Sequence, residues 1–393
     1  MLTTTTSFAA LLALLAWSAP SAAEPPLPVT SDADVPSIAL HGMVSQGFMW
    51  SSDNNYLTRS SKGSVELSAV ALNVTAQITH ELRVGMQLFA RDLGPLGNYA
   101  AKFDWYYLDY RLTDWLGLRA GRLKVPFGLY NEFADIDAAY LPVLLPQSVY
   151  PTTNRDFLLA QTGAEAYGFI DLCDGGALEY RVYGGTIFLD RPEPVPGSPI
   201  AVAGIDVPYV FGARLMWETP LDGLRLGGTV QSLEIDTHDV ISGATPIALD
   251  LTFPVTIWLA SIEYAPGDLT LAAEYSRWHG ELTSNIPAIF PGVKVTNERY
   301  YVMVADRFAK WLQVGAYYSA FYLDKDRRHG RANYQHDAAL TVRFDIGDHW
   351  LVKVEGHYMR GTGQLDPDLN GGTPLSQLKA DWGVLMLQTS AFF

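Results

Sequence analysis

Apolar side chains recur at every second position through most of this chain. From residue 38 onward the sequence divides into sixteen segments of about ten to fifteen residues with this two-residue period, which is the period of a β-strand. Helical spacing is nowhere sustained. In the clearest segment, 334–345, apolar residues such as Leu340 and Val342 alternate with Thr341 and Arg343. An apolar and a polar face on every strand is what a transmembrane barrel with a wet interior requires.

The connections between these segments alternate between very short and longer ones. This asymmetry is typical of outer-membrane barrels, which have short periplasmic turns and long outer loops. The short joints centre on His80-Glu81, Thr113-Asp114, Asp174-Gly175-Gly176, Leu221-Asp222-Gly223, Pro266-Gly267-Asp268, Ala309-Lys310 and Gly347-Asp348. The longer joints are Ser51 to Gly63, Gly94 to Asn98, Pro126 to Gln161, Asp190 to Val207, Thr237 to Phe253, Glu281 to Thr296, Asp324 to Ala332 and Thr362 to Ala380.

The predicted fold is therefore all-β: a transmembrane, antiparallel, up-and-down β-barrel of 16 strands, with both termini at the end of the short turns. Four tryptophans lie within a few residues of a short turn, where an aromatic girdle is expected: Trp115, Trp217, Trp311 and Trp350. The last segment, 381–393, alternates in the same way and ends on Phe393. The phase of strands two, four and five is ambiguous, so Asp109 and Arg119 could face either way.

The N-terminus predicts export. Residues 1–23 read as a signal peptide, with an apolar run from Phe8 to Trp17 and small residues at the expected cleavage site. We expect residues 24–37 to be a short periplasmic segment and residues 38–393 to be the barrel, placed in the outer membrane of a Gram-negative bacterium in contact with its lipid. The formal charge of −15 argues against nucleic acid as a partner.

If the apolar faces meet lipid, the opposite faces line the lumen, and there basic residues outnumber acidic ones. A charged ring in a narrow pore sets ion preference, so this pattern favours anions. The alternative is that these bases are solvated or paired with nearby Glu. The predicted pore-wall residues are Arg83, Arg91, Arg122, Lys124, Arg181, Arg214, Arg225, Arg299, Arg307, Arg343 and Lys353.

The third of the longer joints, after Pro126, has no periodicity and an unusual length, which marks it as functional. We expect this third outer loop to fold into the lumen, where Glu132, Asp135 and Asp137 would face bases such as Arg122 and Lys124 and form a pore constriction. The alternative is a surface loop that caps the barrel or meets a neighbouring subunit.

The sequence gives little indication of a metal site or of catalysis. The His residues show no paired spacing, so no metal site is predicted. Asp366, Asp368 and Asn370 match the start of a calcium loop, but Gln377 stands where the closing Glu belongs, and a plain turn fits better. There is no nucleophile elbow, so no catalytic residue and no cofactor is expected.

Three stretches carry a family resemblance: Asp109 to Leu112, Asp114 to Gly128, and Pro146 to Tyr150. They resemble the phosphate-selective porin O and P family over about forty residues. The resemblance implies a sixteen-stranded, usually trimeric, outer-membrane channel whose third loop constricts the pore. The chain has 8 Lys and no Lys cluster, whereas phosphate-specific members line the pore with clustered Lys, so only the channel role is carried over.

The predicted function is that of a passive porin for small hydrophilic solutes with a preference for anions. The predicted assembly is a homotrimer. One alternative is a structural barrel that ensheathes a partner protein and does not conduct. A barrel enzyme is the third possibility.

Overall fold

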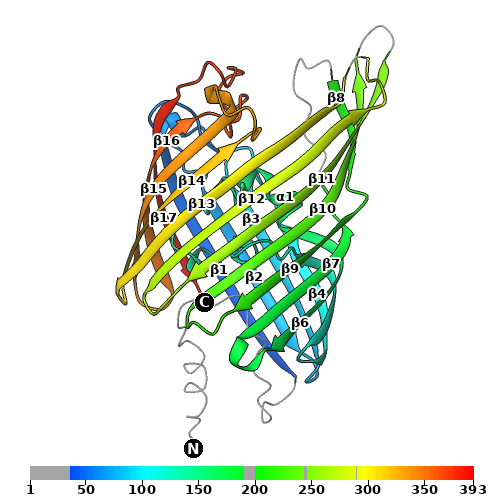
Figure 1. The fold of residues 1–393 in the computed structure, drawn as a ribbon. Helices are drawn as coiled ribbons and strands as arrows, with labels where there is room; N and C mark the ends of the chain where they lie inside the picture. The colour runs from blue at the N-terminus through cyan, green and yellow to red at the C-terminus, as the bar shows by residue number, and fades with distance from the viewer. Residues whose placement is uncertain (1–35, 190–199, 243–245, 289) are drawn as a thin grey trace, which may run out of the picture.

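The computed structural model describes residues 36–393 except 190–199, 243–245 and 289. The predicted signal peptide and most of residues 24–37 lie outside the described residues. The described chain forms one closed antiparallel sheet (Figure 1). Its strands are β1 Ser37–Ser51, β2 Ser68–Gln77, β3 Leu82–Asp92, β4 Lys102–Thr113, β5 Leu116–Lys124, β6 Ala160–Asp171, β7 Ala177–Thr186, β8 Ile200–Asp206, β9 Val210–Glu218, β10 Leu224–Ile241, β11 Ile247–Tyr264, β12 Leu269–Ser284, β13 Val293–Ala309, β14 Leu312–Tyr322, β15 Tyr334–Asp345, β16 Trp350–Gly361 and β17 Asp381–Phe392.

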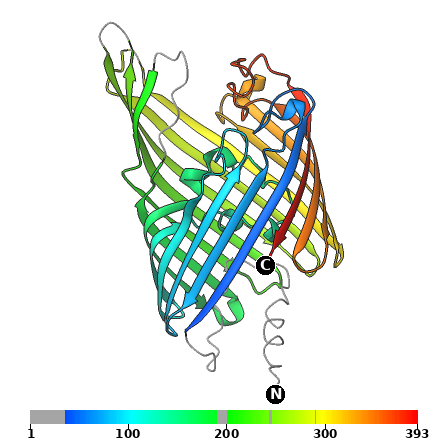
Figure 2. The same cartoon turned by 180° about the vertical axis from the view of Figure 1, so that it is seen from behind.

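These strands occupy sixteen positions in the wall, as predicted. β8 and β9 both pair antiparallel with β10, so they are successive pieces of one wall strand. The sheet closes where β1 pairs antiparallel with β17, for example Gln46 with Thr389. Figure 2 shows β1 in blue beside the dark red C-terminal strand. Closure joins the first and the last wall strand, so no open edge remains between them, as a strand structure in lipid requires.

The wall has apolar side chains on its exposed face and polar side chains on its buried face, the reverse of the distribution in a soluble protein. Along β15, Leu340 is 57% exposed while the neighbouring Thr341 is 1% exposed, and the same alternation of exposed apolar and buried polar residues recurs on the other strands. Asp109 and Arg119, whose orientation the sequence left open, lie on the buried polar face. An exposed apolar band around a polar interior is the pattern of a membrane barrel.

The short joints lie where the sequence predicted them, and the four tryptophans next to them are exposed. The predicted joint from Thr237 to Phe253 is wrong. β10 and β11 continue into it and pair from Leu224 opposite Tyr264 to Ile241 opposite Ile247. The ladder of backbone hydrogen bonds includes polar residues of this stretch such as His238, Asp239 and Asp250. β8, β12 and β13 likewise extend into two neighbouring joints.

In the residues that the structure describes, helical structure is confined to single turns. These are one α-helix, α1 Arg155–Leu158, and the 3-10 turns η1 Ser60–Lys62, η2 Asn131–Phe133, η3 Asp137–Ala139, η4 Thr152–Asn154, η5 Cys173–Gly175 and η6 Arg331–Asn333. Within the described ranges, no helix has the length and apolar character needed to cross a membrane.

Candidate functional site

The segment 125–159 links β5 to β6 and packs against the polar face of the wall. Pro126 follows the last residues of β5, and the backbone N–H of Val125 donates to the carbonyl of Leu159 at 2.7 Å, which closes the base of the loop. Gly128 has φ of 60°, and a Cβ there would lie 2.5 Å from the hydroxyl oxygen of Tyr150. Glycine is therefore needed for the turn that directs the chain away from the strand.

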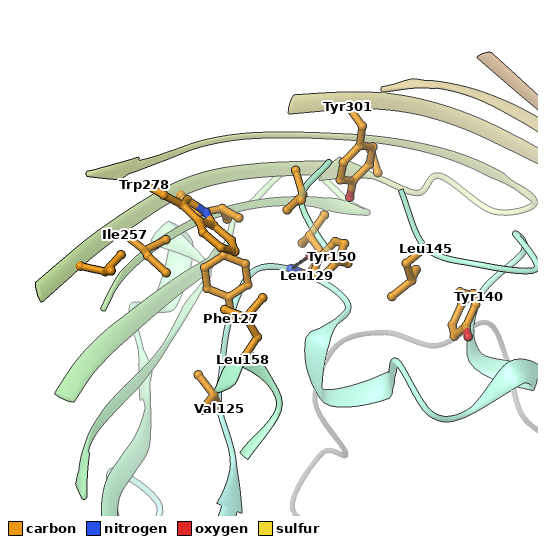
Figure 3. Packing of buried hydrophobic residues seen from close by; sticks show 14 of the residues in the cluster. Val125, Phe127, Leu129, Tyr140, Leu145, Tyr150, Leu158, Ile257, Trp278 and Tyr301 are labelled. Atoms are coloured by element: carbon orange, nitrogen blue, oxygen red, sulfur yellow. Dashed lines mark hydrogen bonds between the residues drawn. The ribbon is translucent and has the colours of Figure 1, made fainter. Parts of the chain in front are cut away.

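An apolar cluster holds the first part of this loop. Figure 3 shows the loop residues Phe127 and Leu158 beside Trp278 of β12 and Ile257 of β11. Phe127 and Ile257 are fully buried. Because the wall residues of this cluster lie on the face opposite the exposed apolar band, the loop covers the polar side of the sheet.

Glu274 of β12 is a polar anchor inside this cluster. Its carboxylate accepts hydrogen bonds from the backbone N–H of Leu129 at 2.9 Å and from the hydroxyls of Tyr301 at 2.9 Å and of Tyr150. Glu274 is 2% exposed. A buried carboxylate with this many donors fixes the geometry of its neighbours, since a buried acceptor left without partners is costly.

Glu132 extends from the loop to two arginines of the wall. Its carboxylate lies 2.5 Å from Arg181 Nη1 of β7 and 2.8 Å from Arg214 Nη1 of β9. Burial by itself would raise the pKa of Glu132, but these two guanidinium groups outweigh burial and lower it to about 2. Glu132 is therefore ionised across the neutral range and ties the loop to the wall.

Arg181 and Arg214 belong to a chain of ion pairs that we call the charge ladder, which crosses β3 to β9 on the polar face. Each side chain pairs with the next at 2.8 to 3.8 Å, between neighbouring strands except for Arg181 and Glu179 on β7, so bases and acids largely cancel. The ladder consists of Arg83, Asp109, Arg119, Glu165, Arg181, Glu179 and Arg214.

Asp135 lies in a second ion-pair group. Its carboxylate is 3.1 Å from Lys124 Nζ and 2.7 Å from Arg155 Nη2, and the same Arg155 nitrogen is 2.8 Å from Asp104 of β4. Burial opposes ionisation, but Arg155 and then Lys124 outweigh it and lower the pKa of Asp135. Arg122, which the sequence analysis placed opposite the loop acids, donates from its Nε to the backbone carbonyl of Asp104 at 2.9 Å.

The tip of the loop, residues 137–143, is held by β15, β16 and β17. We call this set of contacts the tip latch. Lys353 Nζ donates to the carbonyls of Tyr140 and Pro142 at 2.8 and 2.7 Å, and Glu355 accepts from the N–H of Val143 at 2.9 Å. The remaining contacts are Ser390 Oγ to Asp137 at 2.6 Å and Arg343 Nη1 to the carbonyl of Ala138 at 2.7 Å.

The other predicted wall bases are also engaged. Arg225 pairs with Glu263 at 2.6 Å, and Arg307 and Arg343 share Asp345 at 2.8 and 2.7 Å. Arg299 donates to the carbonyl of Ser148 at 3.0 Å and lies over the ring of Trp278. Arg91 Nη2 is 3.4 Å from the carbonyl of Thr152. Among the described residues, no carboxylate forms an ion pair with Arg122, Arg299 or Lys353, which bind carbonyl oxygens instead.

The sequence analysis left the orientation of Asp109 and Arg119 open, and it missed three further charged residues of the site: Asp104, Arg155 and Glu165. Asp109 and Glu165 alternate with exposed apolar residues, so an unambiguous strand phase would have identified them. Arg155 lies in α1, where no strand period applies, and the sequence contains no signal for its role.

The calcium candidate is a turn. Asp366 Oδ1 accepts from the N–H of Asp368 at 2.8 Å, and Asn370 Nδ2 donates to the carbonyl of Asp366 at 2.9 Å. No cluster of three or more His, Cys, Asp or Glu side chains suited to a metal ion occurs in the described part of the chain.

Comparisons with known proteins identify the fold. No family model and no curated protein matches the chain. Among solved structures, in-vitro folded OmpT, an outer membrane protein of Vibrio cholerae, matches with a TM-score of 0.58 at 10% identity over 92% of this chain and 99% of that one. OmpF of Salmonella typhi matches with a TM-score of 0.56 at 12% identity, over 91% and 97%.

A third similar structure is the anion-selective porin from Comamonas acidovorans, with a TM-score of 0.51 at 12% identity over 91% of this chain and 100% of that one. At such identities the likeness establishes the fold. This chain has the fold of the porin-like, sixteen-stranded outer-membrane β-barrels.

Proposed function

We propose that the chain is a passive diffusion channel for small hydrophilic solutes in the outer membrane of a Gram-negative bacterium. The observation that carries this proposal is a closed sixteen-position wall with an exposed apolar face and a buried face rich in charge. Barrels of about sixteen strands are wide enough to enclose an aqueous channel, whereas about eight strands are filled by side chains. The proposed export signal, residues 1–23, is consistent with this location.

In this proposal, segment 125–159 lies across the lumen and narrows it. Support comes from its contacts with well separated parts of the polar face: Glu132 reaches β7 and β9, Leu129 reaches β12, and Asp137 reaches β17. A segment that binds so many positions around the inside of a closed wall has to cross the enclosed space. Glu132, Asp135 and Asp137 then form the loop side of the constriction.

The test is ion conductance of the purified protein in a planar lipid bilayer. We expect discrete conductance steps in potassium chloride. A protein that is folded by circular dichroism and inserts in the bilayer but never conducts would contradict the channel proposal. That result would favour the second candidate, a structural barrel around a partner, which is suggested by the size of the apolar cluster that the loop makes with the wall.

We also propose a modest preference for anions. Most wall bases are matched by acids, so the net field is smaller than the list of bases suggests. Arg122, Arg299 and Lys353 are the wall bases that bind carbonyl oxygens in place of carboxylates. The similarity to an anion-selective porin agrees with this sign. Reversal potentials in a salt gradient measure the preference, and a cation-selective potential would overturn it.

The family and the assembly are further parts of the proposal. The stretch that resembles the phosphate-selective porins begins before β5 and continues to Gly128, and Pro146 to Tyr150 lies in the same loop. The resemblance thus falls on the proposed constriction. Because members of that family are usually trimeric, we also propose a homotrimer. Light scattering of the detergent-solubilised protein measures its molar mass and tests this.

A further inference from the structure

Two arginines meet one glutamate on the exposed apolar face of the wall. Arg277 of β12 lies directly opposite Glu298 of β13 in the strand register. Both belong to the exposed face, because they alternate in phase with the exposed residues Leu271 on β12 and Val302 on β13. Arg328, from the long joint between β14 and β15, reaches the same carboxylate. A face that is otherwise apolar therefore carries a charged cluster at this place.

The cluster lies where the apolar band of the wall ends. Between Ala309, beside a short turn, and Glu298, β13 covers about 11 residues, which at a rise of about 3.3 Å per residue and a tilt of about 45° gives a height of roughly 26 Å. The apolar band of outer-membrane barrels is about 25 Å tall. The cluster is therefore at the level of the lipid headgroups, at the end of the barrel that carries the long joints.

Aromatic rings flank the two arginines. The Cζ atom of Arg277 lies 5.7 Å from the ring centroid of Trp258 and 5.6 Å from that of Tyr275. The Cζ atom of Arg328 lies 4.6 Å from the ring centroid of Tyr322. Tyr and Trp collect at membrane interfaces, because one end of each side chain is apolar and the other is polar. A stacked guanidinium group uses its face and leaves N–H groups at its edge for an acceptor.

The glutamate compensates only one of the two arginines. The buried carboxylate of Glu298 accepts hydrogen bonds from the Tyr275 hydroxyl at 2.5 Å and from Arg328 Nη2. Arg328 Nε donates to the carbonyl of Lys325 at 2.9 Å. Arg277 Nε donates to the Tyr275 hydroxyl at 2.7 Å, and its Nη2 is 3.7 Å from the Glu298 carboxylate, which is longer than a hydrogen bond. The side chains of Arg277 and Arg328 are 38% and 47% exposed. The cluster thus has an excess of one positive charge, on partly exposed guanidinium groups.

We propose that this cluster binds the phosphate group of an anionic lipid in the outer leaflet of the membrane. Guanidinium groups match phosphate oxygens in charge and geometry, so Arg277 and Arg328 bind the phosphate while Glu298 positions their side chains. The acyl chains of the same lipid pack on the exposed apolar residues Val302 and Val304 of β13. The formal charge of the whole chain is −15, so an anionic lipid is held where positive charge is locally in excess.

The experiment uses the full protein in detergent and measures bound lipid by native mass spectrometry. The two probes are dilauroyl phosphatidic acid, which ends in a phosphate monoester, and dilauroyl phosphatidylcholine, which has the same acyl chains but a zwitterionic headgroup. We expect the first phosphatidic acid to bind with a dissociation constant several-fold lower than that of the first phosphatidylcholine. This comparison on the unmodified chain needs no variant to fold.

Arg277→Gln and Arg328→Gln test the two arginines separately. Each variant leaves Glu298 one guanidinium group and the Tyr275 hydroxyl, so the carboxylate keeps partners. We expect each to raise the dissociation constant of phosphatidic acid about tenfold, as for the loss of a hydrogen bond to a charged group, and to leave that of phosphatidylcholine unchanged. Arg327→Gln removes the same charge from the same joint, at a side chain that is 84% exposed, and is the matched control.

Three results would overturn the proposal. The first is equal affinity of the unmodified chain for the two lipids, and the second is equal binding of phosphatidic acid to the folded Arg277→Gln, Arg328→Gln and Arg327→Gln variants. The third is displacement of phosphatidic acid by inorganic phosphate at the same concentration, which would mean that the cluster binds free anions. The site lies outside the lumen, so a barrel that prefers phosphatidic acid but never conducts contradicts the channel and supports the lipid site.

Discussion

Lys353 Nζ lies 2.8 Å from the backbone carbonyl oxygen of Tyr140, which is 213 residues earlier in the chain. The sequence predicted that Lys353 lines the pore wall. Its ammonium group is instead fully buried and lies over the Tyr140 ring, 4.5 Å from the centroid. A residue of this kind positions the loop, and its charge contributes less to the field in the lumen than an exposed lysine would.

Lys353→Met should release the loop tip. The substitution leaves two buried carbonyl oxygens without a donor, each at a cost of about 1–3 kcal/mol, so the latched position becomes less favourable. We expect a higher and noisier single-channel conductance, together with protease cleavage within residues 137–143. Lys310→Met changes an exposed lysine at a short turn and is the control. Identical conductance and cleavage in both variants would show that the latch does not set the pore size.

Glu132→Gln should weaken the loop attachment and change selectivity together. Truncating one partner of a buried ion pair typically costs about 3–5 kcal/mol, because the remaining charge stays buried. Arg181 and Arg214 keep Glu179, so we expect a loss toward the lower end of that range in denaturant unfolding. The lumen gains one net positive charge, and the reversal potential should shift toward anions. Glu218→Gln, at an exposed position of β9, should change neither quantity.

The contact of Glu132 with Arg181 and Arg214 should persist down to acid pH. The guanidinium groups of Arg181 and Arg214 overcome the effect of burial and hold the pKa of Glu132 at about 2, below the value of about 4.3 for an unperturbed Glu. A carboxylate with a lowered folded pKa contributes stability that is present above the unfolded pKa and is lost as the pH falls through the folded pKa. The difference in conductance between the unmodified protein and Glu132→Gln should therefore be steady from pH 7 to about 4 and disappear between about pH 4 and 2. A difference that disappears already near pH 6 would contradict this assignment.

The strand period and the turn spacing were enough to predict the barrel. In β15 the alternation of Leu340 with Thr341 reports which face meets lipid, because the two environments select opposite residue types. The same rule failed at Thr237 to Phe253, where polar residues are compatible with a strand that is wetted on both faces. Residue type alone does not separate such a strand from a loop.

The pairing inside the barrel could not be predicted. Whether Arg181 pairs with Glu132 depends on the path of the loop from β5 to β7. The loop sequence has no strand or helix period, so it does not indicate which loop residue lies opposite which wall residue. That the loop acids and the wall bases together form the pore constriction stays a prediction. The ion pair of Lys124 with Asp135 agrees with it, whereas the hydrogen bond described for Arg122 goes to the carbonyl of Asp104.

The orientation of the barrel can be tested with its single cysteine. Cys173 is exposed in the short turn η5, so the proposed topology places it in the periplasm, whereas Asp368 lies in the long joint between β16 and β17. A bulky membrane-impermeant maleimide added to intact cells should therefore leave the unmodified protein unlabelled and label it after the outer membrane is permeabilised. Cys173 has φ of 55°, so Cys173→Gly removes the thiol without backbone strain. In that background Asp368→Cys should be labelled on intact cells. Labelling of Cys173 from outside would mean that the barrel has the opposite orientation.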